Sequence, residues 1–279
     1  MGKILWLASY PRSGNTWLRV FLHNLLRNPD EPYDINRLQD LTLVDSQARW
    51  YRQFDPRPLT ELSKEEVAAL RPRVHAALGA GNADTVLVKT HNALVEDRGT
   101  PMVSLDHTAG AIYVVRNPLD VAVSYAVHFG VSHEEAVAAM GRPRNQSISN
   151  QTNFAYEVHG SWSENVASWT AQPNPLLHVV RYEDMAGDPA ATFGGIAAFL
   201  GLNVTADRLR KAIRHSLFEV LKSQEQTRGF QERSLKSEVF FRSGQVGDGE
   251  KHLSRELIDR LNREHREQMS RFGYGERSA

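Results

Sequence analysis

Three short segments of the chain carry side chains that could bind an anion and move a proton. Their charged residues are Arg12, the pair Lys89 and His91, and Arg116. Arginine and lysine can oppose the charge of an anionic substrate, whereas histidine titrates near neutrality and can accept a proton. These residue types predict an anion-binding site that also performs proton transfer.

Each of these segments directly follows an apolar run of the kind that forms a buried strand. The runs are residues 4–8, 85–88 and 111–115, and a fourth, 176–180, leads to Tyr182. Continuous apolar runs are typical of parallel sheets, and ligands of such sheets bind outside the carboxyl ends of the strands. The sequence therefore predicts an α/β fold that gathers the polar residues at one edge of the sheet.

The first turn has the form of a phosphate-binding loop but departs from the nucleotide triphosphatase pattern. The backbone N–H groups that open a helix lack intrahelical partners, so an anion is held where the loop enters the following helix. A Walker loop ends in Gly-Lys-Ser/Thr. Here Gly14 is followed by Asn15 and Thr16, and Ser9 takes the place of the first glycine. The cation comes earlier in the turn, as Arg12.

A resemblance to a known family begins in residues 10–17, which read Tyr-Pro-Arg-Ser-Gly-Asn-Thr-Trp. This run resembles the donor-binding loop of sulfotransferases that use 3′-phosphoadenosine 5′-phosphosulfate (PAPS), whose common form is Tyr-Pro-Lys-Ser-Gly-Thr-Thr-Trp. Residues 89–91 resemble the catalytic segment of that family. Residues 116–124, with the pattern Arg-x-Pro-x-Asp-x-x-x-Ser, resemble its site for the 3′-phosphate of the donor. Residues 160–162, Gly-Ser-Trp, are also similar to the family.

The resemblance implies a role for each matching residue. His91 would be the general base, and Arg12 with Lys89 would stabilise the leaving phosphate oxygen. The donor-binding residues that it implies are Arg12, Ser13, Gly14, Asn15, Thr16, Trp17, Arg116, Ser124, Tyr182, Phe218, Arg242, Ser243 and Gly244. No metal is implied, because the cationic side chains already oppose the charge of the donor.

Two departures from the family pattern affect the expected chemistry. Arg12 stands where many relatives have lysine, and arginine stabilises charge but donates a proton poorly. In the C-terminal closing loop, predicted at 224–252, Ser243 replaces a lysine and Gly249 replaces a tryptophan. These changes remove one charge and one packing anchor from the donor site.

The resemblance and the composition together predict a single α/β domain over 1–279, with a central parallel sheet flanked by helices, similar to P-loop kinases. Residues 28–84 and 142–154 are predicted to be insertions on the acceptor side. Lys+Arg and Asp+Glu are both 33, and there is no cysteine. Equal charge gives no reason to expect nucleic acid or an anionic membrane as a partner, and we expect a cytoplasmic enzyme. The sequence has no decisive interface signal, which leaves monomer and homodimer open.

Outside the motifs, the apolar patterns predict helices near residues 63–78, 160–169, 189–200, 206–213, 217–222 and 255–272. Ser63 and Glu66 would form a capping box for the first of them. The aromatic residues Trp50, Tyr51 and Phe54 suit either the core or an acceptor pocket.

The acceptor is predicted to be a small molecule with a hydroxyl group. The loop spelling and residues 160–170 resemble bacterial sulfotransferases that modify alcohols or phenols of natural products, including glycopeptides. Two alternatives stay open: a small-molecule kinase of the P-loop type and a nucleotide-binding module without catalysis. For the segment 116–124, a surface pair between Arg116 and Asp120 is the alternative to phosphate binding.

Overall fold

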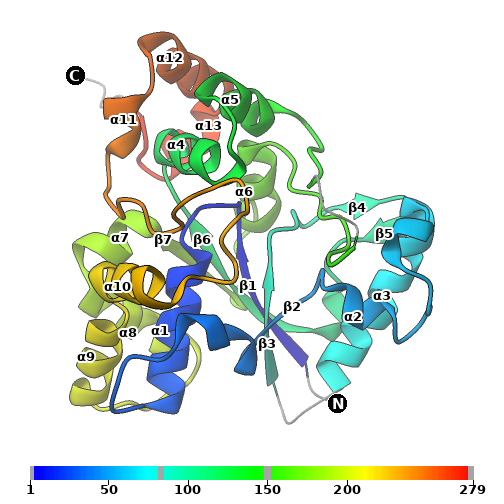
Figure 1. Cartoon of the computed structure of the whole chain (residues 1–279), viewed down its shortest axis with the longest axis horizontal. Coiled ribbons are helices and arrows are strands. Elements are labelled where there is room, and N and C mark those ends of the chain that lie inside the picture. The colour runs from blue at the N-terminus through cyan, green and yellow to red at the C-terminus, as the bar shows by residue number, and fades with distance from the viewer. Residues whose placement is uncertain (1–2, 81–84, 148–151, 276–279) are drawn as a thin grey trace. The chain divides into compact units, whose positions relative to one another are not determined.

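The computed structural model describes residues 3–80, 85–147 and 152–275, and its main sheet has five strands in the order β2-β3-β1-β6-β7 (Figure 1). The strands are β1 (Lys3–Ser9), β2 (Thr42–Val44), β3 (Thr85–Thr90), β6 (Thr108–Val115) and β7 (Leu177–Arg181). Both β1 and β2 run parallel to β3. The predicted α/β class, with a central parallel sheet flanked by helices, is confirmed.

The interior of the sheet explains why the apolar runs form strands. Ile4, Trp6 and Leu7 of β1 are fully buried although neighbouring side chains point to opposite faces. Both faces of this strand are therefore covered, as the continuous apolar sequence predicts. Ile4 pairs with Val86 and Leu7 with Lys89, so the polar ends of β1 and β3 come to the same edge.

By backbone contacts the chain divides into two compact units, each made of three segments. The first unit consists of Met1–Tyr10, Thr42–Tyr113 and Arg142–Val179. The second unit consists of Pro11–Leu41, Val114–Gly141 and Val180–Ala279.

In the first unit, helices and short strands surround the strands β1 to β3. These elements are α2 (Ala48–Tyr51), η2 (Leu59–Glu61), α3 (Lys64–Ala80), β4 (Glu96–Asp97), β5 (Thr100–Pro101), η3 (Leu105–His107) and α6 (Trp162–Thr170). The predicted capping box of α3 is present, because Ser63 and Glu66 each accept the backbone N–H of the other. Trp169 of α6 stacks on Tyr113 with ring centroids 5.9 Å apart.

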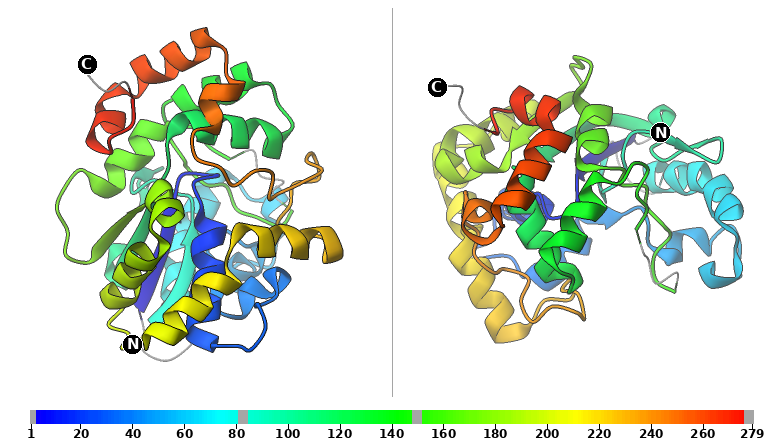
Figure 2. Two further views of the ribbon diagram at one scale, coloured as in Figure 1. Left: turned by 90° about the vertical axis from the view of Figure 1, so that its left-hand side faces the viewer. Right: turned by 90° about the horizontal axis from the view of Figure 1, so that it is seen from above.

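The second unit is mostly helical. Its elements are α1 (Asn15–Arg27), η1 (Ile35–Asp40), α4 (Pro118–Phe129), α5 (His133–Gly141), α7 (Tyr182–Gly187), α8 (Pro189–Phe199), α9 (Ala206–His215), α10 (Phe218–Arg228), α11 (Asp248–His252), α12 (Arg255–Glu264) and α13 (Arg266–Arg271). Figure 2 shows α12 beside α4 and α5, and α9 beside α1.

A hydrophobic cluster in the second unit joins α1 to the segment that follows α10. Its buried members are Val20, Ile35, Leu38, Leu221, Phe230 and Phe241. Beside it, the fully buried Arg19 of α1 forms two hydrogen bonds of 2.8 Å to the carboxylate of Glu232. The carboxylate of Glu225 accepts the backbone N–H groups of Phe240 and Phe241 at 2.7 and 2.8 Å. These contacts fix residues 229–241 without regular secondary structure.

Several boundaries differ from the sequence expectation. The single helix predicted over 255–272 is wrong, because His265, with φ −114° and ψ 11°, separates α12 from α13. The helix predicted at 217–222 continues to Arg228, so the segment 224–252 begins inside α10. The range 28–84 supplies the edge strand β2, which the sequence did not suggest. Parts of the predicted insertions, residues 81–84 and 148–151, lie outside the described residues.

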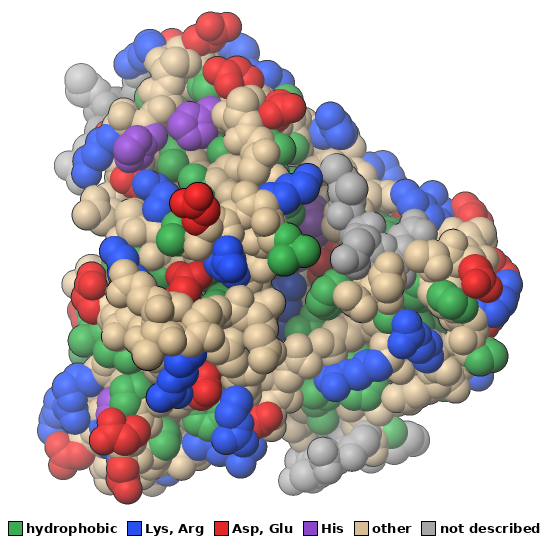
Figure 3. Space-filling model, in the orientation of Figure 1, with side chains coloured by type: hydrophobic (Ala, Val, Ile, Leu, Met, Phe, Trp, Pro, Cys, Tyr) green, Lys and Arg blue, Asp and Glu red, His purple; other side chains and the backbone are tan. Residues whose placement is uncertain are grey.

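Surface charges of both signs are interspersed over the face drawn in Figure 3, in keeping with the equal numbers of cationic and anionic residues. Within the described ranges, no helix combines the length and the apolar character needed to cross a membrane. In the same ranges, no group of three histidine, aspartate or glutamate side chains is arranged to hold a metal ion.

Candidate active site

In the second unit, the loop before α1 is shaped to leave the helix start open. Gly14 is the N-cap, with φ 108°, and no side chain caps the first turn of α1. A Cβ atom at Gly14 would lie 2.7 Å from the ring of Tyr182, so only glycine allows this approach. The uncapped N–H groups and the helix dipole favour an anion here.

Arg12 in this loop is held by three acceptors. Its Nε donates to Ser124 Oγ at 3.1 Å, one terminal nitrogen to His128 Nδ1 at 3.3 Å, and the other to the Phe240 carbonyl at 3.1 Å. The guanidinium also lies 4.1 Å from the centre of the Phe240 ring. Arg12 adopts a positive φ of 68°, which is uncommon for a residue with a side chain. The fork of the guanidinium therefore joins α4 to the segment after α10.

Arg116, at the end of β6, lies next to Arg12. One of its terminal nitrogens donates to the Arg12 carbonyl at 3.3 Å and the other to the Gln245 carbonyl at 3.2 Å. Its guanidinium stacks on Tyr182 at 4.1 Å. Asp120 lies 3.9 Å away, and both side chains of this pair are buried, so the pair is not a surface one.

These two arginines form a concentrated positive charge. Burial, and next the charge of Arg116, lower the pKa of Arg12 to about 9, while Glu225 and Tyr182 act in the opposite direction. A guanidinium with this pKa still carries its charge at neutral pH. Two cations that are held close together, one half-buried and the other buried, are stabilised by an anion, so the arrangement favours a phosphate or sulfate group.

The segment around Gly244 lies against the same residues. The Tyr182 hydroxyl donates to the Gly244 carbonyl at 3.1 Å, and a Cβ at Gly244 would come within 2.4 Å of the Phe218 ring. Asp120 accepts the N–H groups of Gly247 and Gly249 at 3.0 and 2.7 Å. The carboxylate of α4 thus holds this segment in place beside Tyr182.

Arg242 and Ser243 bond to one carboxylate, that of Asp248. Arg242 forms an ion pair with Asp248, and Ser243 Oγ donates to Asp248 Oδ2 at 3.1 Å. Burial works to raise the pKa of Asp248, but the hydrogen bond and charge of Arg242 outweigh it and lower the pKa. The structure therefore gives Arg242 an internal anion.

The other loop residues include buried polar atoms without a hydrogen-bond partner among the described residues. These atoms are Ser13 Oγ and Trp17 Nε1, and Arg116 Nε is a third. The Trp17 ring packs edge-on against Tyr182, with centroids 5.4 Å apart. Buried polar groups normally have partners, so these atoms fit a site that a polar ligand completes.

In the first unit, His91 follows the last residue of β3. Its Nδ1 lies 2.8 Å from the Ser9 carbonyl, which can only accept, so Nδ1 carries the proton and Nε2 has its lone pair free. The side chain of Asn165 donates to the His91 carbonyl at 3.1 Å. This geometry fixes the tautomer that a general base requires.

The charges around His91 keep it neutral. Burial, and next the charge of Lys89, lower the pKa of His91 well below its usual value of 6.5, while Glu157 and the Ser9 carbonyl act in the opposite direction. His159 packs edge-on against His91, with ring centroids 6.1 Å apart. A neutral imidazole in this position is ready to accept a proton at neutral pH.

The predicted site residues thus fall into two groups. The first unit contains Lys89 and His91, and the second contains all the residues predicted to bind the donor. Sequence reasoning missed His128 and Phe240 as partners of Arg12. The spacing of Ser124 and His128, four residues apart on one helix, was an available signal. Glu157 and His159 lie in a polar stretch that carried no such signal.

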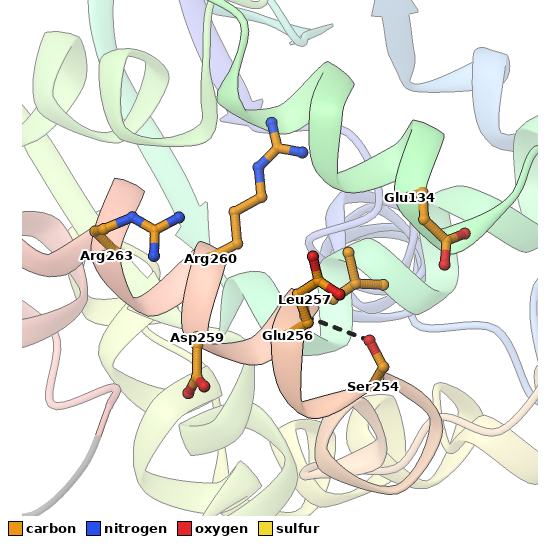
Figure 4. A pocket seen from close by; sticks show the side chains of 7 residues that line it. All are labelled: Glu134, Ser254, Glu256, Leu257, Asp259, Arg260 and Arg263. Carbon is orange, nitrogen blue, oxygen red and sulfur yellow. Dashed lines mark hydrogen bonds between the residues drawn. The ribbon is translucent and has the colours of Figure 1, made fainter.

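A hollow on the second unit lies elsewhere. It measures about 650 Å³ and is lined by Glu134 of α5 and by Ser254, Glu256, Leu257, Asp259, Arg260 and Arg263 at α12 (Figure 4). Ser254 caps α12 by accepting the Leu257 N–H at 3.4 Å. None of these residues belongs to the groups around Arg12 or His91, so we place the site by its chemistry and not by the size of this hollow.

Comparisons with known proteins identify the family and the fold. A family model described as "Sulfotransferase domain" matches residues 3–273. Sulfotransferase 1B1 of the dog, Canis lupus familiaris, is 30% identical over 218 residues, which cover 77% of this chain and 65% of that protein. The structure of mouse sulfotransferase SULT7A1 complexed with PAP superposes with a TM-score of 0.63 at 20% identity, over 96% of this chain and 84% of that one. Retinol dehydratase in a complex with retinol and PAP gives a TM-score of 0.64 at 19% identity, over 99% of this chain and 83% of that one. The fold predicted from the resemblance is confirmed, and the chain belongs to the sulfotransferase family.

Proposed function

We propose that the protein transfers the sulfuryl group of PAPS to a hydroxyl group of a small molecule, with His91 as the general base. The observation that carries this proposal is the pair of neighbouring arginines, the half-buried Arg12 and the buried Arg116, beside the uncapped start of α1. This arrangement suits a ligand with several anionic groups. The two similar solved structures contain PAP, which supports PAPS as the donor.

The residues proposed to hold the donor are Arg12, Ser13, Gly14, Asn15, Thr16, Trp17, Arg116, Ser124, Tyr182, Phe218, Arg242, Ser243 and Gly244. The start of α1 would bind the 5′-phosphate, and Arg116 with Ser124 and Arg242 would bind the 3′-phosphate. The rings of Trp17, Tyr182 and Phe218 suit the adenine. Arg242 would reach a phosphate only by sharing or leaving its ion pair with Asp248.

In the proposed reaction the donor supplies an activated sulfuryl group for an in-line displacement. Transfer of this kind depends mainly on positioning and on stabilising charge. His91 Nε2 would take the proton of the acceptor hydroxyl, while Nδ1–H remains bonded to the Ser9 carbonyl. Arg12 and Lys89 would stabilise the negative charge on the leaving phosphate oxygen.

We propose an alcohol or phenol of a natural product as the acceptor. The similarity of the loop and of residues 160–170 to bacterial natural-product enzymes supports this choice. Retinol, the alcohol in one of the similar solved structures, is a small hydroxyl compound of the same broad class.

Calorimetric titration tests the donor assignment. We expect adenosine 3′,5′-bisphosphate (PAP) to bind more tightly than 5′-AMP, because only the former carries the 3′-phosphate. Arg116→Ala should weaken PAP binding by about tenfold to a hundredfold, from the loss of a charge-assisted hydrogen bond. Arg210→Ala, at an exposed residue of α9, is the matched control and should leave the affinity unchanged. Indifference to the 3′-phosphate, or a preference for ATP with magnesium, would overturn the proposal in favour of a kinase.

A measurement of turnover tests the proposed role of His91 as the general base. With PAPS and 2-naphthol as a simple phenol, followed by a panel of alcohols and phenols, we expect sulfate ester formation by the wild type. His91→Ala should lower kcat by about a hundredfold or more, the range of general-base catalysis, while PAP affinity is kept. PAP binding without turnover on any member of the panel would support a binding module without catalysis.

A further inference from the structure

Glu157 is a buried carboxylate that the reaction described above does not use. It lies in the first unit and is 9% exposed. Its backbone is fixed by Ser147 from both sides, because the Ser147 N–H donates to the Glu157 carbonyl at 2.8 Å and the Glu157 N–H donates to Ser147 Oγ at 2.9 Å. A carboxylate is costly to bury and is kept in such a place by specific partners.

The partners of this carboxylate surround the base. Glu157 Oε1 accepts the backbone N–H of His91 at 3.1 Å. Its other oxygen lies 3.7 Å from His159 Nε2. Although burial works to raise it, the pKa of Glu157 is held well below its usual value by Lys89, His159 and His91. The group is therefore ionised, and it is the anion that faces these three basic side chains.

Proton transfer makes this charge important. When His91 takes a proton it becomes a cation close to Lys89 and His159, in a place where burial already disfavours charge. The Ser9 carbonyl supplies a dipole to Nδ1–H but no net charge. A fixed carboxylate bonded to the His91 backbone lowers the free energy of the protonated imidazole through its charge, without a hydrogen bond to the ring.

We propose that Glu157 is a positioning residue for the base: it anchors the backbone of His91 and supplies the negative charge that stabilises the imidazolium formed during transfer. This role rests on the proposed function, in which His91 accepts the proton of the acceptor. The ionisable groups that take part in this interaction are Lys89, His91, Glu157 and His159.

Replacement of Glu157 by glutamine separates charge from geometry, because the amide oxygen can still accept the His91 N–H. With PAPS and 2-naphthol, we expect Glu157→Gln to lower kcat by about tenfold while the KM for PAPS and the affinity for PAP stay unchanged. The acid limb of kcat/KM should move to lower pH by about one unit, because loss of the opposite charge lowers the pKa of His91 further. A carboxylate with a merely structural role would lower kcat without moving this limb, and that result would overturn the proposal.

Three further variants keep the test sharp. Glu157→Asp retains the charge and should keep the acid limb near the wild-type position, even where shortening weakens the contact with the backbone. Glu96→Gln makes the same chemical change at an exposed site of the first unit and should alter neither kcat nor the limb. In the His91→Ala background, Glu157→Gln should have no additional effect on kcat, and an additive loss would show that the residue does not act through His91.

A readout without turnover distinguishes failure of this inference from failure of the proposed function. In NMR spectra of ¹⁵N-labelled protein, the imidazole signals that disappear in His91→Ala are those of His91. The midpoint of their pH titration should be lower in Glu157→Gln than in the wild type. An unchanged titration would overturn the inference even where sulfuryl transfer is confirmed. If the wild type does not bind PAP, the donor assignment is rejected, while the result of the His91 titration remains valid.

Discussion

At the scale of single residues, the site depends on how each cation is paired. The hydrogen bonds of Arg12 to described residues go to Ser124, His128 and the Phe240 carbonyl, whereas Arg242 is paired with Asp248. A cation that is ion-paired to a carboxylate must exchange partners before it binds a ligand. The residues that resemble the family's phosphate ligands are therefore unequal in this chain.

The pairing of Arg242 leads to a prediction for Asp248. Asp248→Asn removes the anion that competes with the 3′-phosphate, so we expect PAP to bind roughly twofold to fivefold more tightly, as for a partly exposed pair worth up to about 1 kcal/mol. Asp207→Asn, at an exposed residue of α9, controls for the change in net charge. Calorimetric titration measures both. An unchanged or weaker affinity would show that Asp248 serves to preorganise Arg242 instead.

The burial of His91 leads to a prediction about pH. A base acts in its neutral form, which predominates above its pKa. Because burial and Lys89 lower that pKa well below 6.5, the acid limb of kcat/KM should lie below pH 6.5, and activity should stay flat through neutrality. The pH profile with 2-naphthol measures it. A limb near or above pH 6.5 in the wild type would contradict the lowered pKa of His91.

At the scale of elements, the segment after α10 contains two glycines whose backbone conformation is unfavourable for other residues. Gly244 has φ 66° and Gly247 has φ 78°, so adding a side chain introduces a similar backbone strain at both positions. Only Gly244 faces a neighbour, because a Cβ there would meet Phe218, whereas nothing lies within 4 Å of a Cβ at Gly247. The two glycines therefore make a matched pair for testing the contact.

Gly244→Ala should push the segment away from Phe218 and weaken PAP binding by about tenfold. Gly247→Ala should cost only the conformational strain, about 1 kcal/mol in the free energy of unfolding, with little change in affinity. Titration with PAP and denaturant unfolding separate the two effects. Equal losses of affinity in both variants would mean that strain, and not the contact with Phe218, governs the segment.

Element by element, the sequence predicted what is local and missed what is set by tertiary contact. The four longer strands and the capping box of α3 follow from apolar runs and from residue types at fixed spacing. The edge strand β2 has only three residues, too few for a pattern. The break occurs at His265, which is buried, and no glycine or proline lies there to predict it.

The candidate site divides in the same way. Residues 10–17 and 116–124 are contiguous motifs, so their types and spacing were readable from the sequence. The hydrogen bonds from Arg12 to the Phe240 carbonyl and from the His91 N–H to the Glu157 carboxylate join residues far apart in the chain. Such contacts depend on how the elements pack, which no local pattern of residues specifies.

At the scale of the whole molecule, positive and negative charges are equal in number, whereas the group around Arg12 and Arg116 is locally positive. The formal net charge is zero, so attraction for an anionic donor comes from the local group around Arg12 and Arg116. We expect PAP affinity to fall as the ionic strength rises from about 0.01 M to about 0.15 M, where the screening length shortens from about 30 Å to about 8 Å. The melting temperature should change little over this range. Salt-independent affinity would indicate that burial, and not charge, dominates donor binding.

The division into two three-segment units has a consequence for synthesis of the chain on the ribosome. The polypeptide passes from one unit to the other after Tyr10, Leu41, Tyr113, Gly141 and Val179. The first unit cannot be complete until Val179 has emerged, and by then two of the three segments of the second unit are already outside without the third. The second unit can be completed only when residues 180–279 have emerged, because it consists of three separate segments and these residues form the last one. No single cut separates them into autonomous fragments, and the late-emerging residues 180–279 decide when the apolar surfaces of α1 and α4 are covered.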